Sequence, residues 1–250
     1  MDFVSPKQRS LNASIRTGAM ALALLLAGCG ESSSDKGTPI AAPSPAIPAP
    51  NGGEWTQIVV ETPEGGFRMG NPDAPVKLVE YASVTCPHCA LFSRQATAPL
   101  TQLVKSGHLS WEFRHYLLFP TDPAMSLLAR CQGAGGFFAV TEQLYASQSD
   151  WSEKVQDLSS AELQRIRALP PQEQVSAMVK SAGLDRLMQR TEIGRCLADD
   201  RQLKKLVALT SLGDREGVPG TPTFFINGKI VPDVGDWGAL RPPLESALRR

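Results

Sequence analysis

The sequence has no surplus of charge of either sign and no long apolar run. Lys and Arg together number 25 and so do Asp and Glu, which leaves a formal net charge of zero. This balance gives no electrostatic basis for binding nucleic acid or an anionic membrane surface. No segment reaches the roughly 18 consecutive apolar residues that a membrane-spanning helix needs. No internal repeat of solenoid length is present either, so we expect one globular unit or a domain with an insertion.

Cysteine is scarce too, and its distribution argues against several kinds of site. The chain has five cysteines and a single C-x-x-C motif, Cys86-Pro87-His88-Cys89. Tetrahedral zinc needs a second pair of ligands, and the other candidates are scattered along the chain: His108, His115, Cys131 and Cys196. A c-type haem motif needs histidine after the second cysteine, where this chain has Ala90. We therefore expect no metal and no haem at this motif.

The C-x-x-C motif directly follows an apolar run at residues 76–81, which predicts a strand leading into a helix. In this setting the first thiol lies at the helix N-terminus, where free backbone N–H groups and the helix dipole favour negative charge. A thiol placed there ionises easily, and the thiolate is the species that attacks disulfides. An inert structural disulfide is the alternative, and the strand-to-helix position disfavours it. The motif therefore predicts thiol–disulfide exchange.

Residues 1–28 have the pattern of a secretory signal peptide. Lys7, Arg9 and Arg16 form a positive n-region, and residues 18–28 form a short, nearly all-apolar h-region. The segment ends in Leu26-Ala27-Gly28-Cys29, which resembles the lipobox of bacterial lipoprotein precursors. That resemblance implies that Cys29 carries a diacylglycerol anchor. Ordinary signal cleavage with loss of Cys29 and a buried apolar helix are the alternatives.

Residues 29–53 differ in composition from the rest of the chain, because Ser, Gly, Ala and Pro dominate them. Such a segment buries too little apolar surface to offset its chain entropy. The prolines favour extended polyproline conformations and so predict a semi-rigid tether. They are Pro39, Pro43, Pro45, Pro48 and Pro50.

The remaining residues predict strands at both ends of a long helical segment. We expect strands at residues 55–60, 67–70, 76–81, 109–118, 223–226 and 229–231, the last two joined by an Asn227-Gly228 hairpin turn. A helix follows the C-x-x-C motif to about Lys105, kinked or broken at Pro99. This order predicts an α/β layer architecture with a helical insertion.

The helical insertion is expected to begin at Asp122, which we interpret as an N-cap followed by Pro123 at the first helical position. About 90 helical residues follow, interrupted at Pro170-Pro171. Asp236 is expected to begin a final helix.

Residues 71–89, the segment 220–228 and the helical block between them resemble the DsbA branch of the thioredoxin fold, and the likeness covers about residues 54–250. The resemblance implies a thioredoxin-like domain at residues 54–120 and 215–250 with an inserted helical domain at 121–214. Pro87 and His88 form the dipeptide found between the cysteines of disulfide-forming members.

The same resemblance implies roles for individual residues. Cys86 would be the nucleophile and Cys89 the resolving thiol, which lies one turn further into the helix and is more buried. His88 would add a donor or a positive charge beside the thiolate. Thr221 and Pro222 would form the cis-proline loop that faces the cysteines and binds a substrate strand. Many DsbA proteins have Val before this proline, so Thr221 departs from the family pattern.

The sequence leaves alternatives open for the role of Glu80 and for the state of Cys131 and Cys196. Glu80 interrupts an apolar strand, where a carboxylate is either paired, solvated at a strand end, or, as the resemblance implies, a proton relay to Cys89. Cys131 has the helical spacing of a core position. Cys131 and Cys196 are either buried free thiols or a structural disulfide, and export favours the disulfide.

The activity implied by the resemblance is that of an extracytoplasmic dithiol oxidase, which needs no cofactor of its own. Its substrates would be unfolded or reduced exported proteins, and a quinone-linked DsbB-like membrane protein would reoxidise it. Its location would be the bacterial periplasm or cell envelope, with lipid anchoring through Cys29. A reductase or isomerase, for example in cytochrome c maturation, and a substrate-binding or chaperone module are the alternatives.

Overall fold

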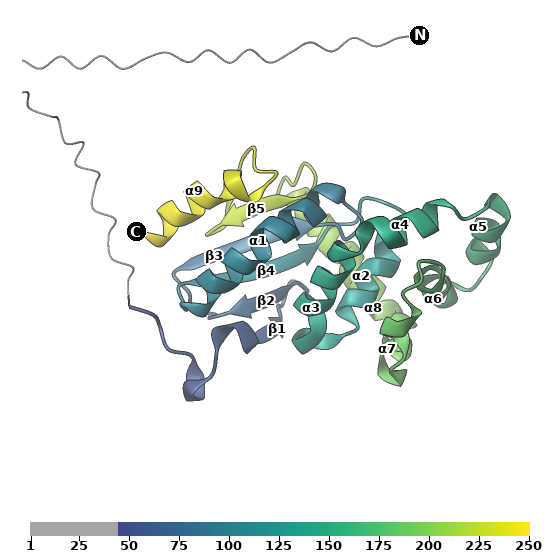
Figure 1. The fold of residues 1–250 in the computed structure, drawn as a ribbon, viewed down its shortest axis with the longest axis horizontal. Helices are drawn as coiled ribbons and strands as arrows, with labels where there is room; N and C mark the ends of the chain where they lie inside the picture. The colour runs from purple at the N-terminus through teal and green to yellow at the C-terminus, as the bar shows by residue number, and fades with distance from the viewer. Residues whose placement is uncertain (1–44) are drawn as a thin grey trace, which may run out of the picture. The chain divides into compact units, whose positions relative to one another are not determined.

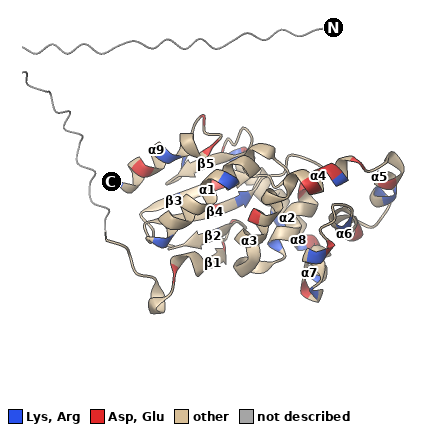
Figure 2. Ribbon diagram, in the orientation of Figure 1, with Lys and Arg blue, Asp and Glu red and all other residues tan. Residues whose placement is uncertain are grey.

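A computed structural model describes residues 45–250 (Figure 1). The predicted signal peptide, Cys29 and the tether before Pro45 lie outside the described residues. Within the described range, no helix combines the length and the apolar character needed to cross a bilayer. Acidic and basic residues are interspersed along the helices and loops of this range (Figure 2).

The centre of the fold is a six-stranded sheet in the order β1-β2-β4-β3-β5-β6. Its central strands β3 and β4 are parallel, and the other neighbours are antiparallel. The strands are β1 Val59–Glu61, β2 Phe67–Gly70, β3 Val76–Ala82, β4 Leu109–His115, β5 Thr223–Ile226 and β6 Lys229–Val231. All seven residues of β4 are buried, as expected for a strand that is covered on both faces.

Helices cover both faces of this sheet. The face that carries Leu78 and Trp111 packs against α1 (Pro87–Lys105), α3 (Gly133–Ala146) and α9 (Trp237–Leu248). The opposite face carries Tyr81, whose hydroxyl donates to Glu216 at the C-cap of α8 (Asp200–Arg215). These two layers hold β3 in the middle of the molecule, so the loop after β3 has a fixed position.

The helices between β4 and β5 share a core with the sheet. They are α2 Asp122–Arg130, α3, α4 Gln148–Gln156, α5 Ser160–Arg167, α6 Pro171–Ser181, the 3-10 helix η3 Asp185–Met188, α7 Thr191–Leu197 and α8. Phe67 of β2 stacks on Phe137 of α3 with ring centroids 4.1 Å apart, and both belong to one buried cluster with Leu128 of α2. The near side of the helical segment is therefore part of the sheet's own core.

Three boundaries differ from those predicted from the sequence. Trp55–Gln57 is a 3-10 helix, η2, and not the start of a strand, because the Trp55 indole turns inward and donates to the Ile47 carbonyl at 2.8 Å. β4 ends at His115, before the predicted Leu118. The helix α1 runs through Pro99 without a break.

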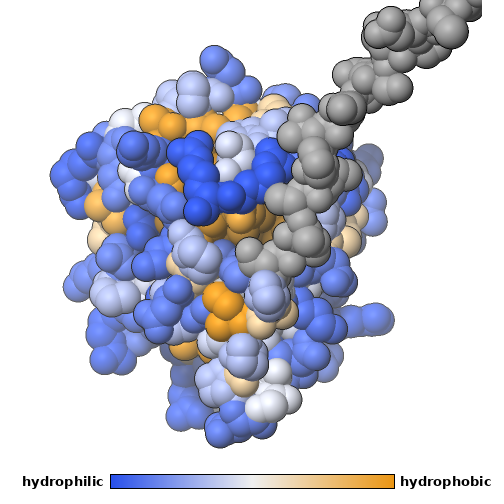
Figure 3. Space-filling view, turned by 90° about the vertical axis from the view of Figure 1, so that its left-hand side faces the viewer, coloured by the Kyte–Doolittle hydropathy of each residue, from blue (hydrophilic) through white to orange (hydrophobic). Residues whose placement is uncertain are grey.

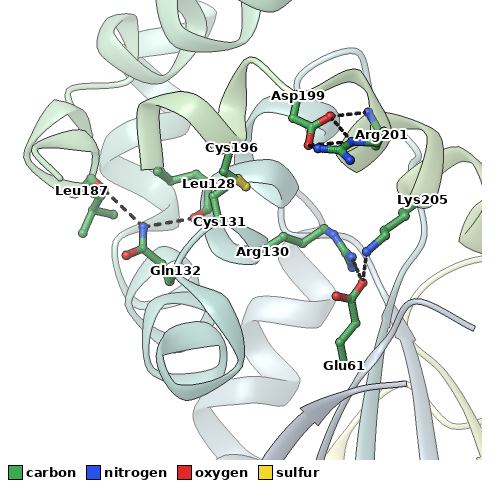
Figure 4. Close-up of a disulfide and its surroundings, with 10 residues drawn as sticks. All are labelled: Glu61, Leu128, Arg130, Cys131, Gln132, Leu187, Cys196, Asp199, Arg201 and Lys205. Carbon is green, nitrogen blue, oxygen red and sulfur yellow. Dashed lines mark hydrogen bonds and ion pairs between the residues drawn. A yellow bond between two sulfur atoms is a disulfide. The ribbon is translucent and has the colours of Figure 1, made fainter. Parts of the chain in front are cut away.

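A disulfide joins Cys131 at the C-cap of α2 to Cys196 in the last turn of α7 (Figure 4). Of the two alternatives left open by the sequence, the structure contains the disulfide. Beside it, the buried Arg130 pairs with Glu61 of β1 at 2.6 Å, and Lys205 of α8 reaches the same carboxylate at 2.8 Å. Together these contacts connect α2, α7 and α8 to the edge of the sheet.

Removing this disulfide is expected to destabilise the fold. The two cysteines are 65 residues apart, and the chain-entropy model assigns about 4 kcal/mol to a cross-link of this span. We expect Cys131→Ala/Cys196→Ala to lower the free energy of unfolding by 2–4 kcal/mol, an order-of-magnitude range. Urea unfolding in a Cys86→Ser/Cys89→Ser background removes any contribution from the other pair. Equal unfolding midpoints with and without the disulfide would contradict this expectation.

Candidate active site

Cys86 occupies the junction between the central strand and the first helix. β3 ends at Ala82, a three-residue loop follows, and Cys86 is the N-cap of α1 with extended backbone dihedrals. Pro87 starts the helix, where its fixed φ suits the first turn and its missing N–H costs nothing. Cys86 is 4% exposed and Cys89 is fully buried, and both are free thiols. The predicted strand-to-helix setting of the motif is therefore present.

The surroundings of Cys86 favour its thiolate and lower its pKa to about 5. The largest cause is the hydrogen bond that the Cys89 thiol donates to the Cys86 sulfur. Burial acts in the opposite direction, and hydrogen bonds from the Thr221 side chain and from the backbone N–H groups of Cys89 and His88 add to the lowering. The thiolate is therefore stabilised mainly by the second cysteine, and the helix N-terminus contributes a smaller share.

Cys89 behaves in the opposite way. Burial, together with the hydrogen bond to Cys86 and the charge of its thiolate, raises the pKa of Cys89 well above its usual value. The two thiols thus share one negative charge, which lies on Cys86. This division favours Cys86 as the attacking sulfur and holds Cys89 as a neutral thiol beneath it.

The proline loop lies against Cys86. The Thr221–Pro222 peptide bond is cis, and the Cys86 sulfur lies 3.4 Å from the Thr221 carbonyl oxygen, to which it donates only while it is protonated. Apart from the two sulfurs, the buried Thr221 hydroxyl has no hydrogen-bond partner among the described residues, so its proton is available to a thiolate. Pro87 and His88 are exposed on the other side of the motif, and His88 acts on Cys86 through its backbone N–H.

Glu80 lies in β3 with neighbours on both sides, Phe113 of β4 and Phe224 of β5. Its carboxyl is 2% exposed and accepts a hydrogen bond from the Trp111 indole at 2.9 Å. Burial raises the pKa of Glu80 to about 8, against the smaller lowering by that hydrogen bond. The charge of Glu80 in turn raises the pKa of Cys89, which places the two groups in electrostatic reach of each other.

A cavity of about 190 Å³ adjoins Glu80 and opens between α1 and α3. Its inner wall is formed by aromatic side chains and its mouth by polar ones, among them Thr97, Thr101 and the exposed Glu142. The volume is large enough for several water molecules. The buried carboxyl therefore lies beside a space that can hold water.

Asp122 differs from its predicted role, because its carboxylate does not cap α2. It is fully buried and accepts hydrogen bonds from Ser83 and Thr85, the residues before Cys86, at 2.7 and 2.8 Å. Its other oxygen accepts from the backbone N–H groups of Leu118 and Phe119, in the loop that follows β4. Asp122 thus ties the loop before the nucleophile to the loop after β4.

Two further residues near the motif carried no signal in the sequence. Trp111 is one apolar position in a strand pattern, and nothing marks it as the donor to Glu80. Tyr145 lies in the middle of the helical segment, and its buried hydroxyl donates to the Ser83 carbonyl at 3.1 Å. The burial of Tyr145 and the charges of Cys89 and Glu80 raise its pKa well above the usual value, so it stays a donor.

No group of three or more His, Cys, Asp or Glu residues within 45–250 is arranged to hold a metal. Cys131 and Cys196 are bonded to each other. The His108 ring is within hydrogen-bonding distance of the Pro45 carbonyl, at 2.9 Å. His115 is buried at the end of β4, and burial holds its pKa well below the usual range. The chemistry of the described site thus rests on the two thiols and the buried carboxyl.

Comparisons with known proteins agree with this architecture. A family model described as Thioredoxin matches residues 62–245. A protein of Rickettsia bellii named as a protein-disulfide oxidoreductase is 27% identical over 177 residues, covering 69% of this chain and 61% of the relative. Its counterpart in Rickettsia prowazekii is 25% identical over 178 residues, covering 69% and 58%. The chain thus spans about three fifths of the length of these curated relatives.

Solved structures show the same fold. A protein-disulfide isomerase from Novosphingobium aromaticivorans matches with a TM-score of 0.68 and 29% identity, over 73% of this chain and 97% of that one. The α-DsbA1 protein of Wolbachia pipientis matches with a TM-score of 0.57 and 21% identity, over 78% and 96%. The predicted fold class, a thioredoxin-like α/β sheet with DsbA-like helices, is confirmed. The chain belongs to the thioredoxin family.

Proposed function

We propose that the protein is a thiol:disulfide oxidoreductase of the DsbA type that oxidises exported proteins outside the cytosol. The observation that carries this proposal is the opposite shift of the two thiols: Cys86 has a pKa of about 5, and Cys89 has a pKa well above that of a free thiol. Relatives named as protein-disulfide oxidoreductases support the same chemistry.

The reaction starts from the oxidised form, in which Cys86 and Cys89 share a disulfide. A substrate thiolate attacks the Cys86 sulfur, so a mixed disulfide forms and Cys89 leaves as a thiolate. A second substrate thiolate then attacks the substrate sulfur of the mixed disulfide, and Cys86 leaves. The substrate gains a disulfide, and the enzyme takes up its two electrons. Because a thiol of low pKa is a good leaving group, the stabilised Cys86 thiolate favours this direction.

Glu80 is proposed to supply the proton that Cys89 needs when it leaves. With a pKa of about 8 the carboxyl is largely protonated at neutral pH. The departing Cys89 thiolate is buried and so has a strong tendency to take a proton. The adjoining cavity gives water a way to reprotonate Glu80.

The Cys86 environment favours an oxidase over a reductase. Stabilising the thiolate stabilises the reduced enzyme, so the oxidised form becomes a stronger oxidant. One structural relative bears the name of an isomerase, which keeps isomerisation as the second candidate. A substrate-binding or chaperone role without turnover is the third.

Anchoring through Cys29 and reoxidation by a quinone-linked DsbB-like protein complete the proposal. The described chain begins at the end of α1 that lies farthest from Cys86, where the Ile47 N–H donates to the Ser106 carbonyl. A helix of 19 residues is about 28 Å long. The described chain is thus attached at the end of α1 opposite to Cys86. This side of the molecule is largely hydrophilic, with smaller apolar areas between (Figure 3).

The direction of electron flow is tested by equilibrating the Cys86–Cys89 couple with glutathione. We expect a potential closer to about −120 mV, as for DsbA, than to about −270 mV, as for thioredoxin. A value near that of thioredoxin would favour the reductase. Cys86→Ser should abolish oxidation of a reduced client protein; a variant that still protects the client from aggregation would favour the chaperone role.

Substitutions of Cys89 measure how much its hydrogen bond contributes to the low pKa of Cys86. Cys89→Ala removes the donor, so we expect the Cys86 pKa to rise, whereas Cys89→Ser keeps an O–H donor and should raise it less. The ultraviolet absorbance of the thiolate, followed through acidic and neutral pH, measures both values. In the unmodified protein, attack by Cys86 should weaken as the pH falls through about 5. Equal pKa values in the two variants would show that the Cys89 donor has no such effect.

Glu80→Gln should slow turnover roughly a hundredfold, the lower end of what general acid–base catalysis contributes. The exposed Glu142 lines the mouth of the same cavity, so Glu142→Gln is the matched control and should leave the rate unchanged.

Because folding raises the Glu80 pKa from 4.5 to about 8, its contribution to stability is lost as the pH rises between these values. Glu80→Gln should therefore be more stable than the parent protein above neutral pH. Unchanged turnover would rule out the proton relay.

A further inference from the structure

Gln148 is a buried amide that joins the helical segment to the catalytic loop. It is the first residue of α4 and is 9% exposed. Its side-chain nitrogen donates to the Val84 carbonyl at 2.8 Å and to the Cys86 carbonyl at 3.1 Å. Both protons of the amide are therefore used, and both go to the backbone of the segment that presents the nucleophile.

The Cys86 carbonyl is the one hydrogen-bonding group of the peptide unit that follows the nucleophile. The next residue is Pro87, which has no N–H, so this peptide plane has no donor of its own. Its carbonyl accepts from the Ala90 N–H at 3.1 Å as the first bond of α1, and from Gln148. Gln148 is thus the contact from outside the helix that fixes the orientation of this plane.

The Val84 carbonyl belongs to the peptide plane on the other side of Thr85. The N–H of that plane, on Thr85, points to Ser83 and to Asp122 at 3.2 and 3.3 Å. Gln148 holds its carbonyl. A single side chain thus binds the peptide planes before Thr85 and after Cys86; the second of these planes directly sets the direction of the Cys86 side chain, and the first holds the loop that leads to it.

We propose that Gln148 is a positioning residue for disulfide exchange: its amide orients the Cys86 backbone so that the sulfur lies between the Cys89 thiol and Thr221. This inference rests on the proposed role of Cys86 as nucleophile. Both Gln148 hydrogen bonds go to backbone carbonyls, so Gln148 acts through the loop that carries the reacting sulfur.

An uncharged amide suits this position for physical reasons. The two carbonyl oxygens are bound by the two protons of one nitrogen, and Gln carries such an NH₂ group. A Glu side chain has the same length, but its ionised form has no donor and would repel both carbonyls and the Cys86 thiolate. Asn is one methylene shorter and could not keep both bonds at their present length.

The test compares Gln148→Met with Gln132→Met. Gln132 is a matched control, because its amide also donates to two backbone carbonyls of the helical segment, Leu128 and Leu187, each at 3.2 Å, close to the disulfide (Figure 4). A merely structural amide would affect stability in both variants and the thiol in neither. Gln148→Glu is a second variant, since an acidic residue is favoured in the first turn of a helix and should permit folding.

The measurements are the thiolate absorbance of Cys86, the second-order rate at which the reduced protein attacks a small disulfide, and the urea unfolding midpoint. We expect both Gln148 variants to raise the Cys86 pKa and to lower the rate at neutral pH about tenfold. Gln132→Met should keep the parent values of pKa and rate even where its unfolding midpoint falls.

The outcomes separate this inference from the proposed function. If Cys86→Ser abolishes exchange but the Gln148 variants keep the parent pKa and rate, or lose no more than Gln132→Met, the positioning role is wrong and the function stands. If Cys86→Ser retains exchange, the proposed function itself is wrong. A Gln148-specific loss that follows the Cys86 pKa supports the inference.

Discussion

The hydrogen bond between the two thiols of the C-x-x-C motif is the interaction on which the site depends. It lowers the pKa of Cys86 and raises the pKa of Cys89, because the proton on Cys89 stabilises the negative charge on Cys86. Burial opposes ionisation of both sulfurs, so the charge survives only on the one that receives donors. The Thr221 side chain and the N-terminal N–H groups of α1 supply the remaining donors.

This balance requires a rigid loop, and the helical segment supplies much of the rigidity. Side chains of α2, α3 and α4 reach the four residues from Ser83 to Cys86: Asp122, Tyr145 and Gln148. The same helices pack their apolar faces against β2 and β4 in a common core. The insertion therefore supports the catalytic loop. Its disulfide joins α2 to α7 within the insertion, and the Arg130–Glu61 ion pair joins α2 to β1 at the edge of the sheet.

Glu80 shows how the fold accommodates a buried carboxyl, which costs folding free energy when it is charged, near the thiols. A carboxyl in the middle of a sheet is disfavoured when charged, and here it is mostly neutral because burial raises its pKa to about 8. Trp111 satisfies one oxygen, and a cavity beside the carboxyl can hold water. The stability lost by placing Glu80 there is consistent with a proton-transfer role, which remains our proposal.

The sequence by itself determined the position of the motif between strand and helix, the hairpin at Asn227-Gly228 and the α/β class with a helical insertion. These follow from local patterns: apolar alternation, helix starts and turn residues. It misplaced the end of β4 and misread Asp122, because two partners of that carboxylate, Ser83 and Thr85, lie 39 and 37 residues away in the sequence. Only the tertiary structure decided that Cys131 pairs with Cys196, that the Cys89 thiol is the main cause of the low Cys86 pKa, and that Gln148 holds the catalytic loop. The disulfide and the Gln148 bond join groups 65 and 62 residues apart in the chain, and the contributions to the Cys86 pKa depend on burial and distance, which no local pattern encodes.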